Sequence, residues 1–247
     1  MARYQTILSY DGTDFAGSQR QDGARTVQKE LEQALRSIGW KGTSVLLAGR
    51  TDRGVHARGQ VAAFDLDWNH ALDDLQRALN AHLPDDMAVL AVSNSAGDFH
   101  PRFAATARRY RYGLFCQEVR DPLRERYAWR VWPEVGDLTG LAVLWPGTHN
   151  FSAFGSPPRP GGSTVRTVFA AGWYPCRDGW TFEIEADAFL YRMVRRLVYV
   201  QVLVGQGRLP LEELPRALES GSGAELPAGL AAPSGLMLLE VKYDGLG

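Results

Sequence analysis

The sequence predicts an α+β fold of two related lobes around a central cleft. Strand-like and helix-like segments alternate along the chain, and the second half broadly repeats the strand and helix content of the first. With 247 residues and 45% hydrophobic content, the chain can bury a substantial core as one large domain or two small ones. We expect an N-terminal lobe at 1–105 and a C-terminal lobe at 106–247.

Helix and strand signals are clear in the first half. Thr26 is a candidate N-cap, because its hydroxyl can accept a hydrogen bond from the first helical turn, and Gly39 is suited to the end of the same helix. Pro84 ends a second amphipathic helix. The expected helices are 27–38 and 72–83, and the expected strands are 4–10, 45–48, 61–64 and 87–92.

In the second half, residues 106–116 alternate as a strand. Tyr110 and Tyr112 share one face of this strand and Arg109 and Arg111 share the other, so one face can pack while the other presents positive charge. The further expected elements are a helix at 138–145, a Pro- and Gly-rich loop at 156–163, a hairpin at 168–186, a helix at 189–204 and a strand at 236–243.

Charge is unevenly distributed along the chain. The formal net charge of -1 argues against a nucleic-acid partner, but arginines cluster at 102–130 and 192–208 while aspartates concentrate at 65–98. Such a distribution can give a neutral protein one basic cleft. Arginine far outnumbers lysine, which suits bidentate phosphate contacts, but we favour codon bias as the explanation of the total.

Cysteine content and hydropathy set further limits. Cys116 and Cys176 lie far apart without metal-ligand spacing, so we predict neither a zinc site nor a disulfide and expect both to be core thiols. No apolar run reaches the roughly 20 residues that cross a bilayer, and the N-terminus enters a strand pattern directly. We therefore expect a cytoplasmic protein.

The most informative segment is 48–61, which reads Ala-Gly-Arg-Thr-Asp-Arg-Gly-Val-His-Ala-Arg-Gly-Gln-Val. It places Asp52 between Arg50 and Arg53 in a Gly-rich loop between two apolar runs, where the flanking strands can hold the loop at both ends. Nearby positive charge favours the ionised carboxylate. Asp52 is therefore a candidate nucleophile, a candidate base, or half of an ion pair.

This segment resembles the signature of the tRNA pseudouridine synthase A (TruA) family, with Asp52 at the position of the family's catalytic aspartate. The resemblance continues along nearly the whole chain: Tyr10-Asp11-Gly12-Thr13 with Gly17 and Gln19, Thr26-Val27-Gln28, Leu79-Asn80 with Leu83-Pro84, Phe99-His100-x-Arg102-Phe103, Arg109-Tyr110-Arg111-Tyr112, and Phe189-Leu190-x-x-Met193-Val194-Arg195. Four positions depart from the family pattern. They are Ser18, Asn150, Arg196 and Tyr199, where the pattern has Trp, Asp, Asn and Gly.

The resemblance implies two lobes that share an extended, mainly antiparallel sheet flanked by helices, usually in a homodimer. It also implies isomerisation of uridine to pseudouridine at positions 38, 39 and 40 of the tRNA anticodon stem-loop, without a cofactor or metal. The N1–C1' bond of the nucleotide breaks and a C5–C1' bond forms. Asp52 would attack C1' of the sugar or C6 of the base, and the sequence leaves both alternatives open.

The resemblance also implies roles for other residues. Tyr110 would stack on the displaced uracil, and Arg195 would pair with Asp52. Because a stacked base cannot reach an aspartate, the target nucleotide must flip out, and Arg50 is the candidate to fill the vacated space. The weaker candidates for contacts with the RNA backbone are His56, Arg58 and Arg109.

Two other functions fit parts of the sequence. A noncatalytic RNA-binding protein would need the arginines and tyrosines but not Asp52. An aspartate-dependent hydrolase or glycosidase would need a second carboxylate, and none lies near Asp52 in the sequence. Release of tritium from C5-labelled uridine in tRNA would separate the synthase from both.

Overall fold

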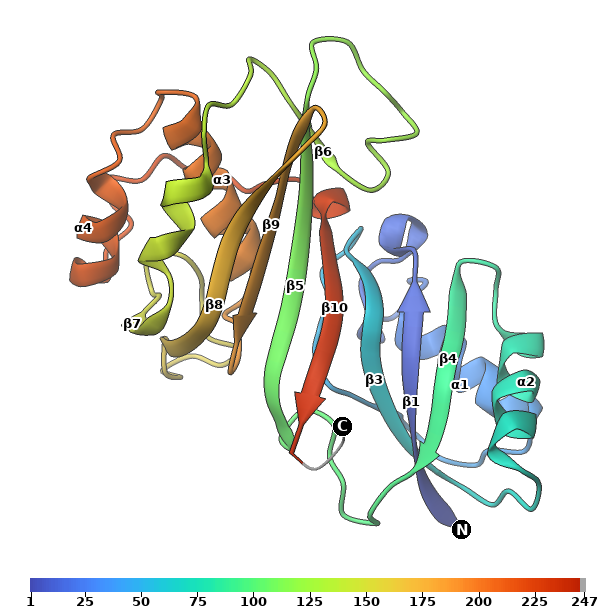
Figure 1. Ribbon diagram of the computed structural model, residues 1–247. Helices are drawn as coiled ribbons and strands as arrows, with labels where there is room; N and C mark the ends of the chain where they lie inside the picture. Colours follow the sequence, from blue (N-terminus) through green and yellow to red (C-terminus); the bar gives the residue numbers. More distant parts are fainter. Residues whose placement is uncertain (245–247) are drawn as a thin grey trace. The chain divides into compact units, whose positions relative to one another are not determined.

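The computed structural model describes residues 1–244, which form two compact units (Figure 1). The first unit contains residues 1–106 and the last strand, and the second contains residues 107–236. The division near residue 106 lies close to the lobe boundary expected from the sequence, but the last strand belongs to the first unit. It does so because Met237 and Leu238 pair in parallel with His56 and Ala57.

The first unit contains a sheet with strand order β4-β1-β3-β10, and β2 also pairs with β3. All of these pairs are antiparallel except that between β3 and β10. The strands are β1 (Ala2–Tyr10), β2 (Leu46–Leu47), β3 (His56–Leu66), β4 (Met87–Asn94) and β10 (Leu236–Tyr243).

Helices α1 (Val27–Ser37) and α2 (Leu72–His82) lie against one face of this sheet, and a short 3-10 turn, η1 (Gly12–Asp14), follows β1 (Figure 1). The predicted cap of α1 is confirmed, because Thr26 Oγ1 accepts a hydrogen bond from Lys29 N at 3.4 Å. Leu31 and Leu35 of α1 and Leu75 of α2 are fully buried. Burial of these apolar side chains is the main stabilising contribution of each helix.

The second unit contains a sheet with strand order β5-β9-β8-β7, and β6 runs parallel to β5 while the other pairs are antiparallel. Trp173 of β8 donates to Gln201 of α3 through Nε1 at 2.8 Å, which joins the sheet to this buried helix. The elements are β5 (Ala105–Cys116), β6 (Trp129–Val131), η2 (Thr139–Leu144), β7 (Gly147–Asn150), β8 (Val165–Cys176), β9 (Gly179–Ala186), α3 (Met193–Gly205), α4 (Glu213–Ser220) and η3 (Pro233–Gly235).

The α+β class and the mainly antiparallel pairing are confirmed. The strand at 4–10, the strand at 106–116, the hairpin at 168–186 and both helices of the first half are also confirmed within a few residues. In residues 1–244, no helix is long and apolar enough to cross a membrane. That the two lobes share one sheet around a central cleft stays a prediction.

Two element boundaries differ from those predicted. Strand β3 begins at His56 rather than at 61, because the second half of the glycine-rich motif pairs with β1 and β10. Helix α3 begins at Met193 rather than at 189, because Arg192 has a φ of 63° and Tyr191 is bridged to Ser156 through the backbone.

The helix expected at 138–145 is present as a shorter 3-10 helix, η2, at Thr139–Leu144. One further expectation was wrong. The cysteines are not core thiols: both are unoxidised, but Cys116 is half-buried and Cys176 is exposed near the turn between β8 and β9.

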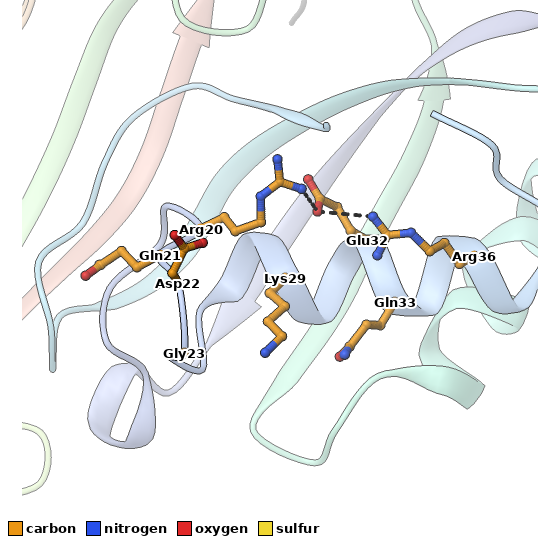
Figure 2. Close-up of a pocket in the computed structure, with 8 residues that line it drawn as sticks. All are labelled: Arg20, Gln21, Asp22, Gly23, Lys29, Glu32, Gln33 and Arg36. Atoms are coloured by element: carbon orange, nitrogen blue, oxygen red, sulfur yellow. Dashed lines mark hydrogen bonds and ion pairs between the residues drawn. The ribbon is translucent and has the colours of Figure 1, made fainter. Parts of the chain in front are cut away.

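A buried carboxylate ties α1 to the segment that leads into β2. Figure 2 shows this carboxylate, Glu32, among residues that line a pocket, with Arg20 and Arg36 beside it. The volume of the pocket is about 250 Å³. The Glu32 side chain is 1% exposed and accepts hydrogen bonds from Arg20 at 2.6 Å and from Val45 N at 3.2 Å. Gln28 also donates to Glu32, at 3.2 Å, so the buried oxygens are well satisfied.

Replacement of Glu32 by Ala leaves Val45 N buried without this acceptor and is expected to lower the free energy of unfolding by about 2 kcal/mol. Urea denaturation measures the loss. The matched control is Gln33→Ala, an exposed neighbour on the same helix and the same pocket, which we expect to change stability by less than about 0.5 kcal/mol. Equal stability of the two variants would contradict the role of Glu32.

Candidate active site

The predicted site residues form two groups, one in each unit. Asp52 and Arg50 lie in the connection between β2 and β3, and His56 and Arg58 lie at the start of β3. The remaining candidates are on β5 and α3: Arg109, Tyr110 and Arg195.

Asp52 occupies a tight turn at the end of the connection between β2 and β3. Ala48 N donates to Val61 O at 2.8 Å, which closes the base of the connection, and Val55 N donates to Asp52 O at 3.1 Å. Gly54 takes a φ of 78°, a conformation that favours glycine. The Asp52 side chain is half-buried, and the turn therefore presents a carboxylate from a short, hydrogen-bonded backbone segment.

This turn is clamped to the segment after β1 by backbone contacts. Ser18 and Thr51 bond reciprocally, with Thr51 N donating to Ser18 Oγ at 2.8 Å and Ser18 N donating to Thr51 O at 3.1 Å. A Cβ on Gly12 would lie 2.0 Å from Val55 O, and one on Gly17 would lie 2.9 Å from Thr51 O. Only glycine permits so close an approach of two backbones.

Buried polar side chains fix the other end of the connection. Gln60 is fully buried and bonds both backbone groups of Gly49, donating to its O at 2.9 Å and accepting from its N at 3.3 Å. The Tyr10 hydroxyl lies 2.9 Å from Thr51 Oγ1. Burial raises the pKa of Tyr10 to about 12, so this hydroxyl keeps its proton at neutral pH. The position of Asp52 therefore depends on an organised buried network.

His56 is buried next to the segment after β1 and forms a hydrogen bond with its backbone. It is 1% exposed, its Nδ1 accepts a hydrogen bond from Gly12 N at 3.0 Å, and the same atom lies 3.2 Å from Asp11 Oδ1. An Nδ1 that accepts this proton carries none of its own, so in that state the contact with Asp11 is not an ion pair. Arg50 and Arg58 are exposed, unlike His56.

In the second unit, Tyr110 lies on the packed face of β5. It is 9% exposed and meets the ring of Phe189 edge to face, at 5.1 Å between centroids and 87° between planes. The alternation predicted for this strand is confirmed, because Arg111 projects to the other face, where its Nε donates to Glu183 at 2.9 Å. Phe189 thus fixes the ring of Tyr110. The sequence had placed Phe189 within a helix at 189–204, but it precedes α3 in the structure.

Arg195 lies in the first turn of α3 and exchanges two hydrogen bonds with Ala231. Its Nε donates to Ala231 O at 2.9 Å, and Ala231 N donates to Arg195 O at 3.2 Å. Burial raises the pKa of the nearby Tyr112 well above its usual value, an effect that the charge of Arg195 opposes. A cation in the first turn of a helix is repelled by the positive end of the helix dipole. A fixed hydrogen-bond acceptor such as Ala231 O therefore helps to hold the Arg195 side chain in place.

The sequence profile of the family described as tRNA pseudouridine synthase matches residues 7–104 and 141–244. The chain belongs to this family. A tRNA pseudouridine synthase A of Chloroflexus aurantiacus is 41% identical over 96% of this chain and 87% of its own length, and one of Streptococcus equi subsp. equi is 37% identical over 99% and 100%. A chain of a solved Cbf5-Nop10-Gar1 complex matches 96% of this chain and 58% of its own length, with a TM-score of 0.32 and 10% identity.

Membership confirms the family resemblance and makes the chain an enzyme of an isomerase family, one of the tRNA pseudouridine synthases. No group of three or more His, Cys, Asp or Glu side chains within residues 1–244 is arranged to hold a metal ion.

Three residues around these groups were not singled out as functional from the sequence: Ser18, Gln60 and Ala231. Ser18 was noted only as a departure from the family pattern, and Gln60 only as a letter of the motif. Both are buried polar side chains, which generally have hydrogen-bonding partners, but their burial is visible only in the structure. Ala231 acts through its backbone, which leaves no signal in the sequence.

The burial of Tyr10 predicts a loss of stability in alkali. The unfolded chain releases the tyrosine proton near pH 10, whereas the folded protein holds it to about 12, so unfolding becomes easier as pH rises through this window. We expect Tyr10→Phe to show a shallower fall in the free energy of unfolding between about pH 9 and about pH 11. Urea denaturation at both pH values measures it, with the exposed Tyr174→Phe as control. Identical slopes for wild type and Tyr10→Phe would show that Tyr10 is not responsible.

Proposed function

We propose that this enzyme isomerises uridine to pseudouridine at positions 38, 39 and 40 of the tRNA anticodon stem-loop, with Asp52 as the nucleophile. The observation that carries the proposal is the half-buried carboxylate on a turn whose backbone is fixed by Ser18, Gly12 and Gln60. A nucleophile held in this way needs little reorganisation before attack. The proposed reaction is redox-neutral and uses no cofactor.

Attack by Asp52 would divide one difficult step into two easier ones through a covalent intermediate. The carboxylate oxygen bonds to C1' of the sugar as N1–C1' breaks, or to C6 of the base before that cleavage, and the proposal admits both. The uracil then turns, C5 bonds to C1', and C5 loses its proton to solvent while N1, freed from C1', takes one up. The bond between the Asp52 oxygen and C1' breaks as C5–C1' forms, or the bond between that oxygen and C6 breaks as C5 loses its proton, so the carboxylate is regenerated. The atoms of the nucleotide are conserved, as isomerisation requires.

Tyr110 and Arg195 are proposed as the other catalytic residues. The fixed ring of Tyr110 suits stacking on uracil, and its hydroxyl suits an orienting hydrogen bond. Arg195 is proposed as the charge partner that keeps Asp52 ionised, and its Nε bond to Ala231 O fixes the plane of the guanidinium.

Binding of tRNA is proposed to involve base flipping and phosphate contacts. The exposed side chain of Arg50 suits the space that a flipped nucleotide leaves, and Arg58 and Arg109 are proposed to contact the RNA backbone. His56, expected from the sequence to contact RNA as well, is buried, and we propose that it acts by holding the segment around Gly12. We further propose a homodimer that acts in the cytoplasm on its tRNA substrate.

Asp52→Asn is expected to abolish the reaction, because the neutral amide is a poor nucleophile. The single-turnover release of tritium from C5-labelled tRNA should fall about 10³-fold or more, while affinity for tRNA stays within about threefold. Asp67→Asn, at an 80% exposed side chain in the same unit, is the matched control and should keep the wild-type rate. Turnover by Asp52→Asn near the wild-type rate would exclude Asp52 as the nucleophile.

Tyr110→Phe keeps the stacking ring and removes only the hydroxyl. Loss of one orienting hydrogen bond, worth about 1.4 kcal/mol, should lower the single-turnover rate about tenfold. Tyr110→Leu, which also removes the aromatic face, should be slower still. If Tyr110→Phe matches wild type in this assay, the hydroxyl has no part in the mechanism.

A further inference from the structure

Residues 226–232, here called the strap, connect the region after α4 to η3 and cross the start of α3. The strap accepts hydrogen bonds through its backbone carbonyls. Ala231 O accepts from Arg195 Nε at 2.9 Å, and Ala232 O accepts from the Tyr112 hydroxyl at 2.8 Å. One short segment therefore holds the proposed charge partner of Asp52 and a fully buried tyrosine.

Arg196 fastens the other end of the strap. Its Nη1 donates to Pro227 O at 2.5 Å and to Gly229 O at 3.1 Å, and its Nη2 donates to Leu226 O at 3.4 Å. Three carbonyls that point to one guanidinium suit the rigid fork of donors of arginine. The side chain is half-buried, and burial lowers the pKa of Arg196 from its usual value.

The ring of Tyr199 packs directly against the strap. A Cβ on Gly229 would lie 2.4 Å from Cζ of Tyr199, and the φ of Gly229 is 142°, so the strap backbone rests directly on the tyrosine ring. The ring stacks in turn on Trp129, at 6.4 Å between centroids and 27° between planes. The Arg196 guanidinium lies 5.8 Å from the centroid of Tyr199, one helical turn away on α3.

We propose that Arg196 and Tyr199 are positioning residues for Arg195, an inference that rests on the proposed function of Arg195. They fix the strap, the strap fixes Ala231 O, and Ala231 O sets the plane of the Arg195 guanidinium through Nε. When the strap moves, Arg195 keeps its charge but loses its orientation. Loss of this orientation lowers the rate of the chemical step rather than the affinity for tRNA, because the guanidinium of Arg196 itself donates to carbonyls of the protein.

The test starts with Arg196→Met, which keeps the apolar stem and removes the donors. We expect the single-turnover rate of tritium release from C5-labelled tRNA to fall about 10- to 100-fold, with the dissociation constant for tRNA changed less than about threefold. Arg196→Lys should recover part of the rate, since its ammonium can reach some of the same carbonyls. Arg216→Met, an exposed arginine of α4 paired with Glu213, is the matched control and should retain the wild-type rate.

A double-mutant cycle then separates positioning from a structural role. In an Arg195→Lys background, Arg196→Met should cost less than about twofold in rate, because its effect passes through residue 195. A full additional loss overturns the inference. If Arg195→Lys alone keeps the wild-type rate, the proposed role of Arg195 fails; if Arg195→Lys is slow and Arg196→Met is as fast as wild type, only the present inference fails.

Gly229→Ala provides a second route that leaves both arginines intact. Its methyl group enters the ring of Tyr199 and displaces the strap, so it should reproduce the loss of rate and the non-additivity with Arg195→Lys. Circular dichroism and tRNA binding establish that each variant is folded. If neither Arg196→Met nor Gly229→Ala folds, the strap is a structural element of the second unit and the inference is overturned.

Discussion

The close approach of two backbone segments, residues 12–18 and 51–55, is the constraint on which the placement of Asp52 depends. Where a Cβ on Gly12 would lie 2.0 Å from Val55 O, no other residue fits without displacing the backbone. The reciprocal bonds of Ser18 and Thr51 then fix the register of the two segments. The backbone that carries the Asp52 carboxylate is therefore in place before any substrate binds, and the proposed role of Asp52 as a nucleophile requires such a fixed position.

The second unit achieves the same result by different means. Arg195 is a long side chain at the start of a helix, and its orientation depends on a carbonyl from a segment 36 residues further along the chain. That carbonyl is placed by the side chains of Arg196 and Tyr199, and not by the close approach of two backbone segments. In both units fixed backbone groups help to place the residue proposed to be catalytic, because backbone groups are fixed by many interactions at once and change position less readily than a single side chain.

Local patterns in the sequence predicted much of this molecule. The cap at Thr26, the stop at Gly39 and the alternation of β5 depend on neighbours within a few residues, and all three are in the structure. The pattern failed where distant pairing decides the outcome. The motif after Gly54 has glycines and charges typical of a loop, yet β3 begins at His56 because Met237 pairs with it. Likewise α3 starts late because Tyr191 bonds to Ser156.

The candidate site could be predicted only in part for a related reason. Asp52 stands out because an acid among arginines and glycines is unusual, and Arg195 stands out because of the resemblance. The groups that orient them are a serine, a glutamine and a backbone carbonyl, whose importance depends on what lies beside them in space. A satisfied hydrogen bond leaves no pattern in the sequence when its partner is 33 residues away, as for Thr51 and Ser18.

Three of the four departures from the family pattern lie at positions that support the proposed catalytic residues. Ser18, Arg196 and Tyr199 contact the backbone segments that hold these residues. Asn150 accepts from Ser152 N at 3.1 Å through its side-chain oxygen, a bond that an aspartate can make equally well. A supporting position needs only a side chain that holds a given backbone group, and several residue types can do so. A nucleophile or a guanidinium fork has no such substitutes, which fits the roles proposed for Asp52 and Arg195, both at positions that match the family pattern.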